Sequence, residues 1–270
     1  MRIYNNVSSV SSQNSLATAS TGMTKSLEKL STGLRINRAA DDAAGLSVSE
    51  GLRSQIRGSQ AAQRNSNDGL AMLQIAESGT NEITNSLQRM RELAIQSSNG
   101  TYTNTDRNYI QAEFTALKSE ITRIAQATTY NGVDLLSTTS TFSFQVSAAS
   151  SGSSSVISFS IATNLSSDLS LGSVGSQASA QTAIASIDTA LASVLSMRSD
   201  VGAAMNRLEK TVSNLGIAIT NMTDAESRIR DTDFASETMQ FTRNQILSNS
   251  ATSMLAQANQ LPQGVMSLLR

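Results

Sequence analysis

Residues 184–229 read IASIDTALASVLSMRSDVGAAMNRLEKTVSNLGIAITNMTDAESRI, and this stretch decides the fold class. Steps taken alternately by three and four residues meet fourteen positions, of which twelve are apolar. Chance would supply about five or six, because the chain is 39% hydrophobic. The positions are Ile184, Ile187, Leu191, Val194, Arg198, Val201, Met205, Leu208, Val212, Leu215, Ile219, Met222, Glu226 and Ile229. This heptad stripe predicts one helix of about 69 Å.

Such a helix does not fit inside a compact globule. A globular chain of 270 residues has a radius of gyration of only about 18 Å. The sequence therefore predicts a mainly α protein built as an elongated rod of long antiparallel helices.

The same three-and-four spacing returns in other parts of the chain and predicts further helices. An N-terminal stripe consists of Met23, Leu27, Leu30 and Leu34. A second helical region is predicted from Ala43 to about Gln96, and a third helix carries Ile110, Phe114, Leu117, Ile121 and Ile124. The C-terminal stripe consists of Leu247, Ala251, Met254, Ala258, Leu261, Val265 and Leu268, and a second stripe that includes Leu255 widens it.

The pattern changes between the third helix and the long one. Apolar and polar residues alternate at 142–146 and again at 157–161, which is typical of strands with one buried face. The loop between them is rich in Ser and Gly. We expect a small β-hairpin near residues 141–162, at the tip where the chain reverses and the helices return.

The composition excludes most catalytic chemistry. The chain has no Cys and no His, which removes thiol nucleophiles, Ser-His-Asp triads and zinc sites of the Cys/His kind. Residues 138–187 contain one charged residue, Asp168. We therefore predict a protein that is not an enzyme and that binds no cofactor or metal. Asp41 and Asp42 stand where a helix begins, so we interpret them as helix caps.

Net charge and hydropathy also limit the kinds of partner that we expect for this chain. A net charge of -1 gives no general attraction to nucleic acid. No stretch approaches the roughly 18 apolar residues of a membrane span, and the N-terminus has no apolar run typical of a Sec signal peptide. We expect no nucleic-acid binding and no membrane insertion.

The two terminal stripes predict self-assembly. The ends can pair as antiparallel helices, but a pair of helices still leaves apolar surface exposed, which a neighbouring chain can cover. Head-to-tail use of such surfaces produces helical filaments unless the rotation closes a ring. The sequence thus predicts the subunit of a rod-like assembly.

Several long motifs at both ends resemble bacterial flagellins. They are LSTGLRIN at 30–37, ADDAAGL at 40–46, LQRMRELAIQ at 87–96, SRIRDTDFASE at 227–237, QIL at 245–247, MLAQANQLPQ at 254–263 and SLLR at 267–270. The centre between the two flanks matches no particular pattern and is short, so the resemblance is to a short flagellin without large outer domains.

The resemblance implies an architecture and a location. Residues 1–41 and 226–270 would be paired inner-core helices, and 42–225 the outer helical domain with its hairpin. The subunit would leave the cell by flagellar type III export and polymerise for motility into the extracellular filament; a periplasmic or sheathed filament is the other arrangement. Implied partners are an export chaperone at the C-terminal helix, filament cap proteins and hook-junction proteins.

Two sets of residues carry these functions. Inner-core polymerisation is assigned to Leu27, Leu30, Leu34, Leu247, Ala251, Met254, Leu255, Ala258, Leu261, Val265 and Leu268. The resemblance assigns subunit packing, and in many bacterial groups recognition by the vertebrate innate flagellin receptor, to Arg89, Leu93, Glu113 and Arg198.

Two alternatives stay open at this point. A hook-filament junction protein shares the terminal helices, although the matches at 87–96 and 247–270 favour flagellin. A cytoplasmic helical signalling rod would also have long helices, but two terminal stripes separated by a β-hairpin argue against it.

Overall fold

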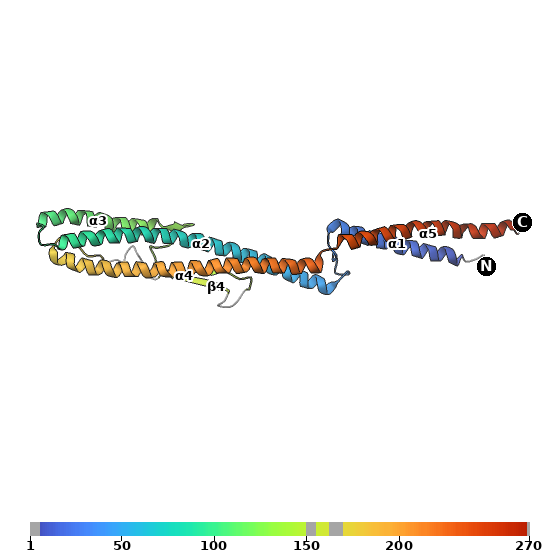
Figure 1. The fold of residues 1–270 in the computed structure, drawn as a ribbon, viewed down its shortest axis with the longest axis horizontal. Coiled ribbons are helices and arrows are strands. Elements are labelled where there is room, and N and C mark those ends of the chain that lie inside the picture. The colour runs from blue at the N-terminus through green and yellow to red at the C-terminus, as the bar shows by residue number, and fades with distance from the viewer. Residues whose placement is uncertain (1–5, 150–154, 162–169, 269–270) are drawn as a thin grey trace. The chain divides into compact units, whose positions relative to one another are not determined.

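The structure, a computed structural model, describes residues 6–149, 155–161 and 170–268, with side chains described as far as residue 260. It confirms the prediction of a mainly α protein with a small antiparallel hairpin (Figure 1). The elements are α1 (Val7–Thr32), α2 (Ala43–Ser98), α3 (Asn104–Ala127), β1 (Thr129–Tyr130), β2 (Val133–Asp134), β3 (Ser140–Gln145), β4 (Val156–Ile161), α4 (Gln177–Arg230) and α5 (Phe234–Leu268).

The chain divides into two compact units. Unit 1 contains the residues up to Ser54 and those from Asn221 onward, and unit 2 contains Gln55–Thr220. The predicted functional boundaries after residues 41 and 225 stay a prediction.

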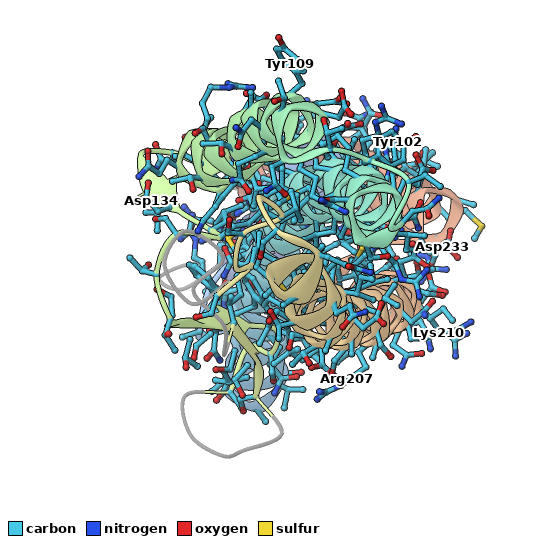
Figure 2. All side chains as sticks on the ribbon, turned by 90° about the vertical axis from the view of Figure 1, so that its left-hand side faces the viewer. Tyr102, Tyr109, Asp134, Arg207, Lys210 and Asp233 are labelled. Carbon is cyan, nitrogen blue, oxygen red and sulfur yellow. The ribbon has the colours of Figure 1, made fainter. Side chains whose placement is uncertain are left out.

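Unit 2 has a continuous apolar core in which α2, α3 and α4 pack together with the hairpin (Figure 1). The view in Figure 2 looks along the helices, and the polar ends of Tyr109, Arg207 and Lys210 point away from this core. Helix α3 buries three residues of its predicted stripe, Ile110, Phe114 and Ile121. Because large side chains fill the interior, unit 2 has the burial that a stable domain needs.

The buried stripe of α4 agrees with the predicted stripe at every second position. At the positions between, the buried residue lies one place earlier in the sequence. Ile187, Val194, Val201 and Leu208 are buried as expected. The intervening buried positions are Ala183, Ala190, Met197 and Ala204, rather than the predicted Ile184, Leu191, Arg198 and Met205. Three of these four residues are alanines, which allow close approach of a neighbouring element, and Ile184, Leu191 and Met205 are partly buried beside them. The shift also moves Arg198 out of the seam.

The hairpin lies along the side of α2. Strands β3 and β4 pair antiparallel with Phe142 opposite Phe159. A Cβ at Gly69 would lie 2.9 Å from a ring carbon of Phe144, and Asn65 Nδ2 donates to the carbonyl oxygen of Gln145 at 3.3 Å. These contacts fall in the middle of α2, so the hairpin does not form the tip that we expected.

A buried arginine closes the turn between α2 and α3. Arg107 is 6% exposed, and its guanidinium donates from Nε to the Ser97 carbonyl oxygen at 2.9 Å and from Nη2 to the Asn99 carbonyl oxygen at 3.0 Å. These are carbonyls at the C-terminal end of α2, where a positive charge also complements the helix dipole. Thr103 and Asp106 form a capping box that begins α3.

In unit 1, α1 and α5 run antiparallel along each other. Asn6 Nδ2 donates to the Ala258 carbonyl oxygen at 2.8 Å at one end, and Lys29 pairs with Glu237 at 3.7 Å near the other. Helix α1 ends at Gly33, which adopts a left-handed φ of 72° that favours glycine.

The segments that leave α1 and α4 are joined by main-chain bonds. Arg35 N donates to the Arg230 carbonyl oxygen at 2.7 Å, and Thr232 N donates to the Gly33 carbonyl oxygen at 3.0 Å. The Arg35 side chain adds a bond to the Ile229 carbonyl oxygen at 2.6 Å. These bonds satisfy carbonyl groups that the end of α4 would otherwise leave without a partner.

Acidic residues cap the helices that follow this junction. Asp42 Oδ1 accepts from Gly45 N at 2.9 Å at the start of α2, and Asp233 Oδ1 accepts from Ala235 N at 2.9 Å at the start of α5. Asp41 instead accepts from the main-chain nitrogens of Arg38 and Asn37, which lowers the pKa of its carboxyl. The capping interpretation is confirmed for Asp42.

A carboxylate next to the junction bridges two arginines. Glu50 Oε1 accepts from Arg230 Nη1 at 2.8 Å and from Arg53 Nη1 at 2.9 Å, and Arg53 Nε lies 3.5 Å from Glu226 Oε1. The hydrogen bonds from Arg230 and then Arg53 lower the pKa of Glu50. The Arg230 side chain is mostly buried, and its Nε has no hydrogen-bond partner among the described residues. Arg230 therefore depends on Glu50 for its charge partner.

We predict that Arg107→Met lowers the stability of the monomer by about 2 to 4 kcal/mol, because the carbonyl oxygen of the buried residue Ser97 loses the guanidinium that donates to it. Thermal unfolding followed by circular dichroism measures the loss. Arg123→Met is the matched control, because Arg123 pairs with Glu120 at the surface of α3. Equal effects of the two substitutions would contradict a capping role for Arg107.

We predict that Glu50→Gln lowers the urea midpoint of the monomer near pH 7, and that this difference shrinks in acid. The pKa of Glu50 is lowered in the folded state, so its stabilising contribution is complete above the unfolded pKa of about 4.3 and is lost as the pH falls through the folded pKa. Urea titrations of both proteins at neutral and acidic pH measure this. A difference independent of pH would show that the charge of Glu50 is not what matters.

Candidate functional site

Small and polar side chains form the seam between α1 and α5. The buried residues on it are Ala19, Ser26, Ala251 and Ala258. Gly22 allows the closest approach, since a Cβ there would lie 2.8 Å from Asn244 Nδ2. Because these fully buried side chains are small, each of them adds little to the hydrophobic stabilisation of the pair.

Five larger apolar side chains of the same helices are half-buried, namely Leu16, Met23, Leu30, Phe241 and Leu255, but eight others face solvent. These eight are Val7, Val10 and Leu27 on α1 and Phe234, Met239, Ile246, Leu247 and Met254 on α5, and they are 51 to 67% exposed. An ordinary amphipathic pair directs its larger apolar residues into the shared seam. In the terminal pair, more of the large apolar side chains in the described residues are exposed than half-buried.

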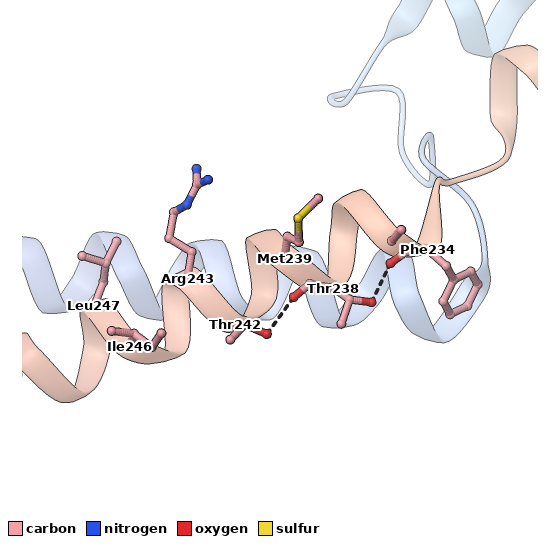
Figure 3. A pocket seen from close by; sticks show the side chains of 8 residues that line it. Phe234, Thr238, Met239, Thr242, Arg243, Ile246 and Leu247 are labelled. Carbon is pink, nitrogen blue, oxygen red and sulfur yellow. Dashed lines mark hydrogen bonds between the residues drawn. The ribbon is translucent and has the colours of Figure 1, made fainter.

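Four of these side chains, Phe234, Met239, Ile246 and Leu247, line an open groove on α5, shown in Figure 3. The groove has a volume of about 780 Å³ and is lined by Phe234, Ala235, Thr238, Met239, Thr242, Arg243, Ile246 and Leu247. The hydroxyls of Thr238 and Thr242 donate to carbonyl oxygens four residues earlier in the helix. Since these hydroxyls are satisfied internally, the groove can accept an apolar partner without leaving them unpaired.

The structure divides the predicted inner-core stripe between seam and outward face. Leu27, Leu247 and Met254 face solvent, whereas Ala251 and Ala258 are buried against α1. Leu30, Leu34 and Leu255 are half-buried. The side chains of Leu261, Val265 and Leu268 lie outside the described residues.

Sequence reasoning missed three residues of the groove, namely Phe234, Met239 and Ile246. A weak signal was available, because positions 235, 239, 242 and 246 follow the four-three-four spacing of a helix face. Thr242 interrupts the apolar pattern of that face, so the spacing did not stand out.

A second predicted site has an exposed charge network. Arg89 on α2 donates to Glu113 Oε1 on α3 from Nη2 at 2.8 Å and to Glu92 Oε2 from Nη1 at 3.0 Å. These bonds, that to Glu113 first, raise the pKa of Arg89. Arg91 makes a bond of 2.7 Å to Asp188 on α4, and this partner was not predicted. The network presents fixed charges at the surface of unit 2.

The other two members of this predicted set lie elsewhere. Leu93 is 2% exposed and packs into the core of unit 2, so its side chain is not on the surface. Arg198 is half-buried on α4, and within the described residues it forms no ion pair with Glu113. Of the four predicted residues, Arg89 and Glu113 therefore form an ion pair at the surface, and neither Leu93 nor Arg198 extends that pair.

The described residues contain neither a candidate metal site nor a candidate membrane span. No cluster of three or more acidic, His or Cys side chains suited to a metal ion occurs among them. No helix within the described ranges has both the length and the apolar character needed to span a membrane.

Comparison with known proteins identifies the family. The model of the bacterial flagellin N-terminal helical region matches residues 3–141, and that of the C-terminal helical region matches residues 184–269. The chain is 42% identical to the flagellar filament 33 kDa core protein of Treponema phagedenis over the full length of both. It is 47% identical to a flagellin of Halalkalibacterium halodurans, with 91% of each chain covered.

A solved structure agrees with these matches. The crystal structure of Bacillus cereus flagellin superposes with a TM-score of 0.50 and 31% identity, over 56% of this chain and 88% of that one. Both flanks match the family models, and the relatives align over nearly all of this chain. The chain belongs to the bacterial flagellin family.

Proposed function

We infer that the chain is the structural subunit of a bacterial flagellar filament and that it polymerises through the outward faces of α1 and α5. One observation carries this inference: the fully buried residues of the terminal pair are small, and eight of its larger apolar side chains are exposed. Family membership supports the same function, because flagellins are structural proteins, and no catalytic role is proposed.

The energetics favour a polymer over a free monomer. Complete burial of one large apolar side chain contributes about 1.5 to 3 kcal/mol. Eight such side chains on α1 and α5 are at least half exposed, so neighbouring subunits can gain many times the contribution of one residue. A net charge of -1 adds little long-range repulsion. Association that uses different faces of each subunit extends as an open helix, which is the geometry of a filament.

The groove on α5 also suits a chaperone before assembly. Exposed apolar surface of this kind promotes aggregation in the cytoplasm, and its polymer partners are absent until export is complete. We propose that an export chaperone covers the groove lined by Phe234, Met239 and Ile246. Cap and hook-junction proteins would meet the same terminal helices at the two ends of the filament.

A second proposal concerns the charge network of unit 2. Arg89 and Glu113 are joined across α2 and α3 and are both about half exposed, so a protein partner can contact a preformed pair without ordering it. We assign to this pair subunit packing and contact with the innate flagellin receptor. A role of Arg198 in these contacts stays a prediction. Leu93 is buried in the core of unit 2 and would support the surface that carries Arg89 and Glu113.

We predict that Ile246→Asp and Met254→Asp abolish seeded filament growth and hardly change monomer melting. Both side chains are 60% exposed in the monomer, whereas burial of an unpaired carboxylate between subunits costs several kcal/mol. Sedimentation after seeding and thermal melting measure the two effects.

Ser143→Asp is the control, because Ser143 is exposed on β3 of the hairpin. It should polymerise almost normally. Normal filaments from both α5 variants, or failure of Ser143→Asp alone, would place the assembly surface on unit 2.

We predict that Arg89→Asp weakens binding of the purified receptor ectodomain to the soluble chain by roughly tenfold, or about 1.4 kcal/mol. The substitution places like charges beside Glu113 and Glu92. Arg123→Asp, which breaks another exposed pair on α3, should leave binding unchanged. Surface plasmon resonance distinguishes the two, and equal losses would indicate a general charge effect.

A further inference from the structure

The turn between α2 and α3 contains an asparagine followed by a glycine, Asn99–Gly100, and both residues are exposed. In such a pair the main-chain nitrogen of the glycine can attack the side-chain amide carbon of the asparagine, because glycine has no Cβ to shield it. The chain has a second pair of this kind, Asn131–Gly132, also exposed, between β1 and β2. The two differ in geometry.

At Asn99 the side chain folds back over the following peptide. Asn99 Oδ1 accepts a hydrogen bond from Thr101 N at 3.3 Å. This bond closes a ring that contains both Asn99 Cγ and Gly100 N, so it keeps the two reacting atoms on the same side of the main chain. The Thr101 N–H also points at the oxygen that becomes negative when the nitrogen adds to Cγ, and such a donor stabilises that charge.

At Asn131 the main chain holds the reacting atoms apart. Asn131 and Gly132 have φ values of 50° and 76°, the left-handed pair of a type I′ turn. In this turn ψ of the first residue is about +30°, which directs Gly132 N away from the Asn131 side chain. The flanking residues Tyr130 and Val133 pair across the hairpin and fix the turn.

We propose that Asn99 is a site of spontaneous imide formation and deamidation and that Asn131 resists this reaction. A bond forms between Gly100 N and Asn99 Cγ, the bond from Cγ to Nδ2 breaks, and ammonia leaves with the proton from Gly100 N. Water then adds to one of the two imide carbonyls. Cleavage at the side-chain carbonyl gives aspartate, and cleavage at the main-chain carbonyl gives isoaspartate. No oxidant or reductant takes part.

The products change the contacts of the turn. The Asn99 main-chain oxygen accepts from Arg107 Nη2 at 3.0 Å and from Tyr102 N at 3.5 Å. Isoaspartate adds one methylene to the main chain at this residue and displaces that oxygen, and either product adds a carboxylate near the buried guanidinium. Deamidation therefore alters the cap of α2, and the altered fraction increases with the age of the protein.

Incubation of the purified full chain in mildly alkaline buffer, followed by peptide mass spectrometry and an isoaspartate assay, tests the proposal. Conversion at Asn99 should exceed conversion at Asn131 by roughly tenfold or more, a barrier difference of at least about 1.4 kcal/mol. Equal conversion at the two sites, or faster conversion at Asn131, would overturn it.

Gly100→Ala is the decisive variant. A Cβ at residue 100 would have no atom within 4 Å, and Gly100 is not among the described glycines with positive φ, so alanine fits without strain. It should retain normal melting and slow conversion at Asn99 by roughly tenfold, while conversion at Asn131 stays unchanged. Unchanged conversion at Asn99 in this folded variant would contradict attack by the nitrogen of residue 100.

Discussion

The packing of α1 against α5 limits how much stability the two terminal helices gain from each other. Ala19, Gly22 and Ser26 bring α1 close to α5, but no large apolar side chain in the described part of either helix is fully buried, so the hydrophobic effect stabilises the pair only in part. Phe234, Ile246 and their neighbours are exposed in the monomer, and we propose that neighbouring subunits cover them. A helix pair of this kind is poorly stabilised alone and well stabilised in an assembly, which is the property required of a filament subunit.

Unit 2 differs from the terminal pair, because it buries large apolar side chains completely. Leu87, Phe114 and Val194 are among the large side chains buried between its helices, and Arg107 closes the turn at the end of α2. Some of its surface charges are paired between helices, as Arg89 is with Glu113 and Arg91 with Asp188. Unit 2 is therefore expected to keep its structure before, during and after assembly, while the terminal helices gain most of their stability from neighbours.

Periodicity in the sequence was enough to predict the helices, the hairpin and a mainly α fold. It could not identify the seam of α4, because a hydrophobicity pattern selects Ile184 and Leu191 where close packing selects Ala183 and Ala190. It could not reveal Arg107 as a cap, since that role depends on a contact between two helices. Nor could it separate residues such as Leu247, which face solvent, from Ala251, which faces α1, because both lie on one stripe.

Amide hydrogen exchange of the dilute monomer and of the assembled polymer measures how far the pairing of α1 with α5 depends on neighbouring subunits. In the monomer, amides of α1 and α5 should exchange nearly as fast as in an unfolded chain, whereas the core amides of α4 around Val194 and Val201 should be protected in both states. Assembly should protect α1 and α5 strongly. Protection of the terminal helices in the monomer as strong as that of the α4 core would contradict the account, because the pair would then be stable without neighbouring subunits.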